Sequence, residues 1–415
     1  PFHSEKTPSF VVFPDTGTWH CFGACGTGGD AFSFIMQQEN LDFGEALQTL
    51  ARRAGVELEP RSPQAAEAEK RLDLLRQINQ AAATYFHHLL FNSDEAVRAR
   101  SYLEKRGLNR QTIDLFQVGY SLDLWDGLLR YLTSKGYTPA DLHEVGLIIE
   151  REDGSGYYDR FRGRVVFPIR DHRGRVLGFG GRILGDGVPK YLNSPQTPLF
   201  DKSSVLFGLD QAKPGIRTAG EAVIVEGYMD VLMAHQHGIN NVVAQMGTAL
   251  TERQLEMLWR MVETPILCLD GDAAGQRAAM RAVSRALPML RPSHSLRIVR
   301  LPSGLDPDDL LKQKGRAAMD YLLGNAASLL ETLWSFERDA QELNTPEEKA
   351  GLKARLLSHV DVIEDQDIRS LYKRELLEKF SAFAFPPREQ KQWQKREWKP
   401  GGFKQATSRL SPEAA

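Results

Sequence analysis

The sequence has few cysteines and no long apolar run. Its 415 residues include three cysteines, Cys21, Cys25 and Cys268, which are too few for a disulfide scaffold and are typical of a reducing compartment. No apolar stretch approaches the roughly 18 residues that a transmembrane helix requires, and no signal peptide is recognisable. We therefore expect a cytoplasmic protein that does not associate with membranes.

A strong net charge is also absent. The chain has 52 lysines and arginines against 54 aspartates and glutamates, for a formal net charge of −2. This balance excludes a uniformly basic chain, but nucleic-acid binding needs only a local basic patch. The length and the 42% hydrophobic content predict two to four domains with sizeable cores. Residue 1 is proline, and we expect the natural chain to begin earlier.

Two apolar stretches end at carboxylates that are followed by glycine. Residues 222–225 precede Glu226, and residues 266–269 precede Asp270 and Asp272. Both stretches have the apolar character of buried parallel strands. In open α/β sheets, ligands bind beyond the carboxyl ends of the strands, where these carboxylates would gather. They would repel one another unless a cation lay between them, and oxygen ligands favour Mg²⁺ or Mn²⁺.

A third expected strand, residues 296–301, is followed by Asp306 and Asp308. A carboxylate after a strand is commonly a helix N-cap, and Asp272 could be one. For any single aspartate, capping is the simpler explanation. For the whole set of carboxylates beyond three expected strands, we favour a site for divalent metal ions.

The first 60 residues predict a small module built on a β-hairpin. His3 lies just before the hairpin, and Cys21 and Cys25 lie at its far end. Close ligand pairs with this spacing are typical of zinc sites. Plain packing of the cysteines is the alternative, and we disfavour it because the surrounding glycines indicate a loop.

A glycine- and arginine-rich segment covers residues 157–202. From Asp159 to Arg182 there are seven arginines and two aspartates, and the alternation predicts a hairpin that turns at residues 171–174. The guanidinium group of arginine can donate paired hydrogen bonds to phosphate oxygens, and glycine lets a backbone approach a ligand closely. A solvated charged surface is the alternative. We favour a polyphosphate or nucleic-acid surface because the arginines lack acidic partners.

Several motifs resemble known families. Glu226-Gly with Asp270-x-Asp272 resembles the Toprim domain of bacterial primases, topoisomerases and some nucleases. Pro-Phe-His3 and Trp-His-Cys21-Phe-Gly resemble the zinc-binding domain of bacterial DNA primases. Gly-Phe-Gly-Gly-Arg182, Pro-Lys-Tyr-Leu-Asn-Ser and Phe-Asp-Lys202 resemble the basic motif of the polymerase core of DnaG-type primases.

The resemblance implies a nucleotidyltransferase, a DNA-dependent RNA polymerase that copies single-stranded DNA into a short RNA primer from ribonucleoside triphosphates. It implies Mg²⁺ (or Mn²⁺) bound by catalytic Glu226, Asp270 and Asp272, with help from Asp306 and Asp308. It further implies a set of residues that contact template or nucleotide. These residues are Arg160, Arg162, Arg182, Lys190, Asn193 and Lys202.

The resemblance also implies Zn²⁺ bound by His3, Cys21 and Cys25. The cysteine that the family carries before Pro-Phe-His would fall at residue 0, so the zinc site is incomplete in this chain. The family usually has two residues between the last two cysteines, and this chain has three. The family also carries a C-terminal domain that contacts the replicative helicase. We expect a fragment cut at both ends, which lacks that domain.

We therefore predict a multidomain protein of mixed α/β and α+β class. The expected parts are a zinc-ribbon-like module (1–60), a linker (61–75), a basic α+β subdomain (76–204), a Toprim-type parallel βαβ sheet (205–310), a helical subdomain (311–382) and a disordered linker (383–415). Two alternatives stay open for the function. They are a Toprim nuclease or topoisomerase, and a non-enzymatic module that binds single-stranded DNA.

Overall fold

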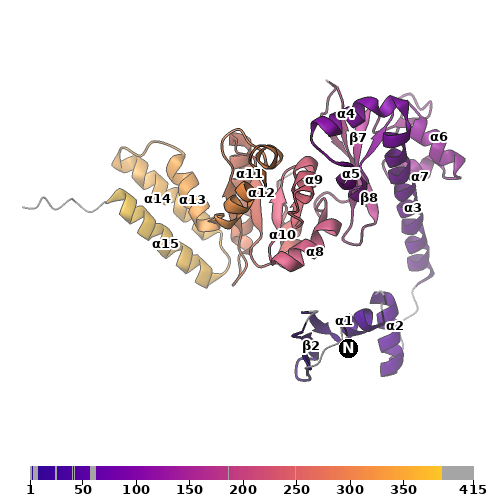
Figure 1. Cartoon of the computed structure of the whole chain (residues 1–415). Coiled ribbons are helices and arrows are strands. Elements are labelled where there is room, and N and C mark those ends of the chain that lie inside the picture. The colour runs from indigo at the N-terminus through magenta and orange to yellow at the C-terminus, as the bar shows by residue number, and fades with distance from the viewer. Residues whose placement is uncertain are drawn as a thin grey trace, which may run out of the picture. The chain divides into compact units, whose positions relative to one another are not determined.

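The computed structural model describes residues 2, 8–23, 26–39, 41, 43–56, 62–185, 187–247 and 249–385. It divides into two compact units, residues 1–74 and 75–415, whose elements are labelled in Figure 1. His3 and Cys25, two of the expected zinc ligands, lie outside the described residues. The same holds for residues 386–415, most of the expected disordered linker.

The first unit contains a small antiparallel sheet with the strand order β1-β2-β3. Its elements are β1 (Phe10–Phe13), β2 (Thr18–Cys21), β3 (Gly28–Asp30), α1 (Ala31–Gln38) and α2 (Phe43–Ala54). The predicted hairpin is thus present, and β2 ends at Cys21, whose side chain is buried. Asp30 caps α1 by accepting a hydrogen bond from the Ser33 amide at 2.8 Å. The third strand and its pairing with β2 were not anticipated from the sequence.

A long helix, α3 (Pro63–Asn92), includes most of the expected linker at residues 61–75. The Ser62 hydroxyl accepts a hydrogen bond from the Ala65 amide at 3.1 Å, and proline occupies the first helical position. The division between the two units falls within this helix, between Leu74 and Leu75. Its later half buries an apolar stripe that includes Leu75, Ile78 and Phe86.

The second unit opens with short helices around an antiparallel sheet of the order β4-β7-β8-β9. Its predicted hairpin pairs β7 with β8 and turns at residues 171–174, where Gly174 has a φ of 82°. Strands β5 and β6, which come between β4 and β7 in the sequence, form a separate two-stranded sheet. The elements are η1 (Asp94–Ala96), α4 (Val97–Lys105), α5 (Arg110–Leu115), β4 (Gly119–Ser121), α6 (Gly127–Ser134), α7 (Pro139–Glu144), β5 (Ile148–Glu150), β6 (Tyr157–Asp159), β7 (Arg164–Arg170), β8 (Val176–Ile183) and β9 (Tyr191–Asn193).

A five-stranded sheet follows, with the order β11-β10-β12-β13-β14. The first four strands are parallel, as predicted, and the short edge strand β14 is antiparallel, which the sequence did not reveal. The elements are α8 (Leu209–Ala219), β10 (Val223–Val225), α9 (Tyr228–Gln236), β11 (Val242–Ala244), α10 (Glu252–Trp259), β12 (Ile266–Leu269), α11 (Ala273–Met289), β13 (Arg297–Arg300), α12 (Pro307–Gly324) and β14 (Ala327–Ser328).

Alternate residues of these strands enter two different cores. Val223, Val225 and Cys268 belong to a cluster that also contains Phe167 of β7. Ile224, Leu267 and Leu269 face the other way, into a cluster with α10, α11 and the C-terminal helices. This follows from the two-residue period of a strand. One face of the parallel sheet therefore shares its core with the four-stranded sheet.

The last three helices among the described residues of the second unit are α13 (Leu329–Asp339), α14 (Pro346–Asp361) and α15 (Gln366–Ala384). They pack against one another, as the orange and yellow helices of Figure 1 show. The helical character expected from residue 312 is thus present. Among the residues that the structure describes, no helix is both long and apolar enough to cross a membrane.

Candidate functional site

The predicted carboxylates follow three neighbouring parallel strands. Glu226 comes directly after β10, Asp270 directly after β12, and Asp306 follows β13. Because β10, β12 and β13 are adjacent and parallel, their carboxyl ends meet at one edge of the sheet. We call this the acidic edge. The sequence therefore located these side chains correctly relative to the strands.

The carboxylates of the acidic edge are close enough to perturb one another. Partial burial raises the pKa of Asp270 to about 7, and the charges of Glu226, Asp306 and Asp272 act in the same direction. Burial also raises the pKa of Glu226, with a further contribution from Asp272. The backbone N–H of Asp270 and the charge of Arg281 oppose this second shift. Glu226, Asp270 and Asp272 are therefore brought together as expected.

Two carboxylate oxygens at this edge have no hydrogen-bond partner within the described part of the chain. They are Oε1 of Glu226 and Oδ1 of Asp308, and both are buried. A buried carboxylate oxygen without a donor is costly, and the cost falls when a cation binds it. This observation fits a divalent cation with oxygen ligands better than it fits a purely structural cluster.

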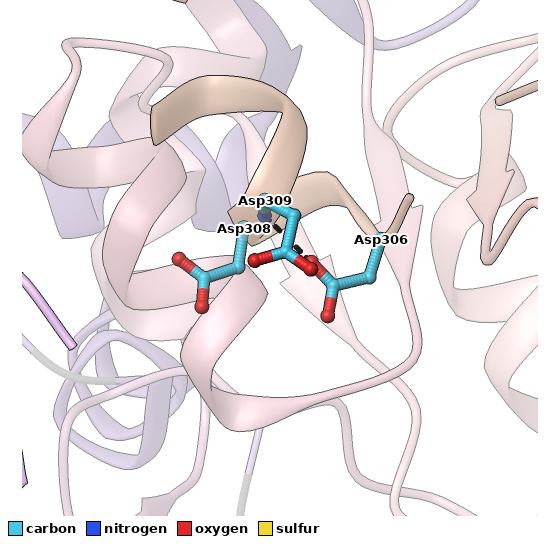
Figure 2. Close-up of side chains that lie close together, drawn as sticks. All are labelled: Asp306, Asp308 and Asp309. Atoms are coloured by element: carbon cyan, nitrogen blue, oxygen red, sulfur yellow. Dashed lines mark hydrogen bonds between the residues drawn. The ribbon is translucent and has the colours of Figure 1, made fainter. Parts of the chain in front are cut away.

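A second group of carboxylates comes from the start of α12. Asp306, Asp308 and Asp309 offer ligand atoms that lie within 4.8 Å of one another. Figure 2 shows the Asp309 carboxylate between those of Asp308 and Asp306. Asp309 was not among the predicted ligands, although its place directly after Asp308 could have suggested it.

Helix capping and cation binding prove compatible at this edge. Asp272 caps α11 by accepting a hydrogen bond from the Gly275 amide at 2.8 Å. Asp306 caps α12 in the same way, with the Asp309 amide at 2.6 Å. In each case the capping bond involves Oδ1, so the second oxygen is left for another partner. The two interpretations offered by the sequence are therefore not exclusive.

Asp308 differs from the other carboxylates because protein cations contact it. Its Oδ2 accepts from Arg106 at 3.1 Å and from Lys312 at 2.8 Å, and the side chain is 1% exposed. Burial raises the pKa of Asp308, while Lys312 and Arg106 oppose the shift. Only Oδ1 is left to contact a metal ion. Asp308 thus connects the acidic edge to a pair of cations that the sequence did not link to it.

Asp230 is a further acidic residue that sequence reasoning missed. It lies in the first turn of α9, four residues after Glu226, and its Oδ2 accepts a hydrogen bond from the Gly227 amide at 2.9 Å. Burial raises its pKa well above the ordinary value, and Asp306 and Asp270 contribute. Asp230 therefore holds the turn after Glu226 and adds to the acidity of the edge. Its place three residues after Gly227, in the motif Glu-Gly-x-x-Asp, is the sequence signal that could have suggested it.

Next to the β5–β6 pair, the predicted Arg162 and a further arginine, Arg151, lie among aromatic rings. Arg162 lies over the Trp125 ring, 3.5 Å from its centroid, and 5.0 Å from that of Tyr158. Arg151 approaches the same two rings at 5.1 and 5.6 Å. Trp125 is 56% exposed. We call these four residues the aromatic–arginine cluster, whose rings and cations suit unpaired bases and phosphates.

A chain of contacts connects Arg182 to the acidic edge. The Arg182 guanidinium lies 4.1 Å from the centroid of the Tyr102 ring. The Tyr102 hydroxyl accepts a hydrogen bond from Nε of Arg106 at 3.3 Å, and Arg106 in turn contacts Asp308. Arg182 is thus linked to Asp308 through Tyr102 and Arg106, and its contact with template or nucleotide stays a prediction. Tyr102 and Arg106 come from α4 and the residue after it, far upstream in the chain, and no motif in the sequence joined them to this site.

The other predicted basic residues are less closely tied to the acidic edge. Arg160 is half-buried, burial lowers its pKa, and its Nε has no partner within the described residues. Lys190 is exposed and Lys202 half-buried, and within those residues neither ammonium group forms an ion pair. Arg164, by contrast, donates to the carbonyls of Gly181 and Pro189, and so it supports the loop before Lys190.

Asn193 lies at the junction between the two sheets. Its Oδ1 accepts a hydrogen bond from the Tyr228 hydroxyl at 2.6 Å. The Tyr228 ring is buried and stacks on Phe167, with centroids 5.0 Å apart and planes 4° apart. Tyr228 is two residues beyond Glu226. The predicted groove residue Asn193 is therefore directly connected to the segment that carries the first carboxylate.

The fold and the site together define a Toprim-type α/β domain coupled to an arginine-bearing antiparallel sheet. In the Toprim-type domain, carboxylates follow adjacent parallel strands. The antiparallel sheet shares a hydrophobic core with that domain.

Comparisons with known proteins agree with this class. Three family models match in succession along the chain. They are a CHC2 zinc finger at residues 1–66, the N-terminal domain of the DNA primase catalytic core at residues 85–213, and a Toprim-like domain at residues 223–311.

Curated relatives include the DNA primase of Halalkalibacterium halodurans, which is 40% identical over 92% of this chain and 63% of its own length. The DNA primase of Escherichia coli (strain K12) is 38% identical over 91% of this chain and 64% of its own length. The chain thus spans less than two thirds of the length of these relatives.

Solved structures give the same result. The catalytic domain of a DnaG primase bound to single-stranded DNA is 37% identical, with a TM-score of 0.67 over 75% of this chain and 99% of that chain. The zinc-binding and RNA polymerase domains of the Aquifex aeolicus primase are 32% identical, with a TM-score of 0.65 over 92% of this chain and 89% of that chain. The chain belongs to the DnaG-type DNA primase family.

Proposed function

We propose that this chain is a DNA primase core, which synthesises short RNA primers on single-stranded DNA by nucleotidyl transfer. The observation that carries the proposal is the acidic edge, where Glu226, Asp270 and Asp306 follow three adjacent strands and where a buried oxygen of Glu226 has no partner among the described residues. Family membership supports the assignment, because the matched relatives are DNA primases.

The residues present fit divalent cations such as Mg²⁺ or Mn²⁺. Glu226, Asp270 and Asp272 would hold one ion, and the Asp306–Asp308–Asp309 group would hold a nucleotide-bound one. Bound there, divalent cations would activate a primer hydroxyl and neutralise the charge of the leaving pyrophosphate. For zinc, only Cys21 of the expected ligands is among the described residues, and its thiol is buried at the end of β2. Zinc binding by His3, Cys21 and Cys25 stays a prediction.

The chain's own residues supply binding and positioning. Arg182 is held by Tyr102, and its charge is not neutralised by a carboxylate within the described residues, so it is available to phosphate oxygens. The aromatic–arginine cluster offers an exposed indole and two guanidinium groups to single-stranded template. Arg160, Lys190 and Lys202 stay predicted contacts, and a replicative helicase stays a predicted partner.

A Toprim topoisomerase or nuclease is the alternative class. A topoisomerase needs an accessible nucleophilic tyrosine, and Tyr228, next to the acidic edge, is 7% exposed and donates its hydroxyl hydrogen to Asn193. Burial raises its pKa, which disfavours a phenolate. Tyr228 therefore does not fit that role.

A primer-synthesis assay tests the proposal. The chain, a single-stranded template and all four ribonucleoside triphosphates should yield short RNA with Mg²⁺ and none with a chelator. Supercoiled DNA incubated in parallel with Mg²⁺ and no nucleotides should stay intact. Nicking without RNA synthesis would support the nuclease class, and DNA binding with neither reaction would support a non-enzymatic binding module.

A further inference from the structure

The Tyr228 side chain is fixed by residues from both sheets of the second unit. Its ring stacks on Phe167 of β7 and meets Phe207 edge-on, with centroids 4.7 Å apart. Gly180 of β8 is required for this fit, because a Cβ there would lie 2.3 Å from the Tyr228 hydroxyl oxygen. Tyr228 is also the first residue of α9, two positions after Glu226. Its ring therefore sets the position of the hydroxyl with little freedom.

The Tyr228 hydroxyl is buried, and Asn193 Oδ1 is its only acceptor within the described residues, so the hydroxyl hydrogen is satisfied only when this oxygen of the amide faces it. A primary amide carries one acceptor oxygen and two N–H donors, and it can be turned either way. Here Oδ1 accepts from Tyr228 at 2.6 Å, so Nδ2 points elsewhere. It lies beside Gly247, where an added Cβ would stand 3.4 Å from Nδ2. Within the described residues, the Asn193 side chain makes no other hydrogen bond.

The position of Nδ2 relates it to the acidic edge. Gly247 follows β11, which is paired in parallel with β10, the strand that ends at Glu226. The amide nitrogen therefore lies at the carboxyl edge of the sheet, on the side where the four-stranded sheet adjoins it. A neutral N–H donor at this place can bind an anionic oxygen without competing with the carboxylates for a cation. A carbonyl oxygen at the same place would repel that oxygen.

We propose that Tyr228 is a positioning residue, which turns the Asn193 amide so that its N–H groups face an acceptor oxygen of the incoming ribonucleoside triphosphate. The inference rests on the proposed function and deepens it, because it specifies that the protein is the hydrogen-bond donor in one contact with the substrate. Tyr228 acts through Asn193 and does not itself touch the nucleotide.

The test separates nucleotide binding from turnover. Tyr228→Phe keeps the ring and removes the hydroxyl, so the amide is free to turn. We expect the KM for ribonucleoside triphosphates to rise about tenfold, as is typical for the loss of one ordered hydrogen bond. The kcat, and the Kd for a single-stranded template measured by fluorescence anisotropy, should change less than twofold. Tyr120→Phe removes another buried tyrosine hydroxyl from the same core and should leave all three quantities unchanged.

A double-mutant cycle checks that the effect passes through Asn193. Asn193→Ala alone should raise the KM as much as Tyr228→Phe does, and the double variant should be no worse than either single variant. Asn193→Asp, which replaces the donor with a charged acceptor, should raise the KM further than Asn193→Ala. Because Asn193 is only half-buried, its variants test the idea even where Tyr228→Phe fails to fold.

Three results would overturn the inference while leaving the proposed function in place. They are an unchanged KM in Tyr228→Phe, fully additive effects in the double variant, and a change confined to the template Kd. Absence of RNA synthesis by the unaltered chain would instead contradict the proposed function itself.

Discussion

Carboxylates dominate the carboxyl edge of the five-stranded sheet, whereas arginines dominate the four-stranded sheet that shares its core. At the acidic edge, Glu226 and Asp270 repel each other, and a buried oxygen of Glu226 has no partner in the part of the chain that the structure describes. Around the other sheet, Arg162 and Arg182 rest on aromatic rings, and Arg164 donates to backbone carbonyls. These three guanidinium groups are therefore held in place with no carboxylate partner among the described residues, whereas Arg175 of the same hairpin pairs with Asp171.

This difference indicates that the two regions bind different ligands. The carboxylates need an added cation to become stable, and so their arrangement favours metal binding. The arginines are already positioned, and so they favour a ligand that carries negative charge and flat rings. Asp308 is the exception, because Arg106 and Lys312 neutralise one of its oxygens. It joins the two regions through the contacts of Arg106 with Tyr102 and of Tyr102 with Arg182.

The largest expected effect comes from Glu226→Gln. It removes one charge from the acidic edge and keeps the shape, so primer synthesis should fall at least about a thousandfold because cation binding is lost. Binding of single-stranded DNA should be largely unchanged. Glu221→Gln is the matched control, because Glu221 precedes the same strand at its other end and pairs with Arg297 there. Unchanged synthesis by Glu226→Gln would remove this residue from the mechanism.

A smaller but still substantial effect is expected where the two regions meet. Gly180→Ala would place a Cβ 2.3 Å from the Tyr228 hydroxyl oxygen, in a packed core. We expect the free energy of unfolding to fall by about 1–3 kcal/mol, as in other overpacked sites. Chemical denaturation measures it. Gly185→Ala, where the added Cβ meets nothing within 4 Å, should have little effect. Equal stability of the two variants would show that the junction is not tightly packed.

Trp125→Ala tests the other side of the comparison. Loss of one stacking ring should weaken binding of single-stranded DNA about tenfold, because a base–aromatic stack contributes roughly 1–3 kcal/mol. The kcat at saturating template should be preserved, since the acidic edge is untouched. Fluorescence anisotropy with a labelled oligonucleotide measures the Kd. Tyr321→Ala removes an exposed aromatic ring on α12 and serves as the control. A lowered kcat with an unchanged Kd would contradict the assignment of template binding to the aromatic–arginine cluster.

The smallest expected effect concerns stability and pH. Asp270 has a pKa of about 7 in the folded chain against an ordinary value of 3.8. The folded chain therefore binds this proton more tightly than the unfolded chain, and metal-free stability should fall as the pH rises from about 4 to 7. Asp270→Asn should remove part of this slope and raise the metal-free Tm at pH 7.5 by on the order of 2 °C.

Melting curves recorded with a chelator between pH 4 and pH 8 check this prediction. Asp94→Asn, which changes an exposed aspartate far from the acidic edge, should leave the slope as it is. A slope that stays the same in Asp270→Asn would mean that the carboxylates at this edge do not repel one another strongly. Added Mg²⁺ should raise the Tm of the unaltered chain more than that of Asp270→Asn.

Sequence pattern alone predicted much of the fold. The strands β10, β12 and β13 and the hairpin of β7 and β8 follow from the local pattern of apolar residues. The short strands β9 and β14 lack the continuous apolar run that marks β10, and so the local pattern does not predict them. Asp230 and Asp309 lie in the first turns of helices α9 and α12, where an acidic residue is common without any metal site, and so their presence in the sequence indicates little.

The sequence by itself determined which residues follow the strands and carry charge, because strand ends and charge are local properties. It placed Glu226, Asp270 and Asp306 at one edge through the topology of parallel strands. The tertiary structure alone decided that Arg106 pairs with Asp308, that Trp125 lies under Arg162, and that Tyr228 orients Asn193. The two residues of each pair lie between 35 and 202 positions apart in the sequence, so only tertiary packing could bring them together.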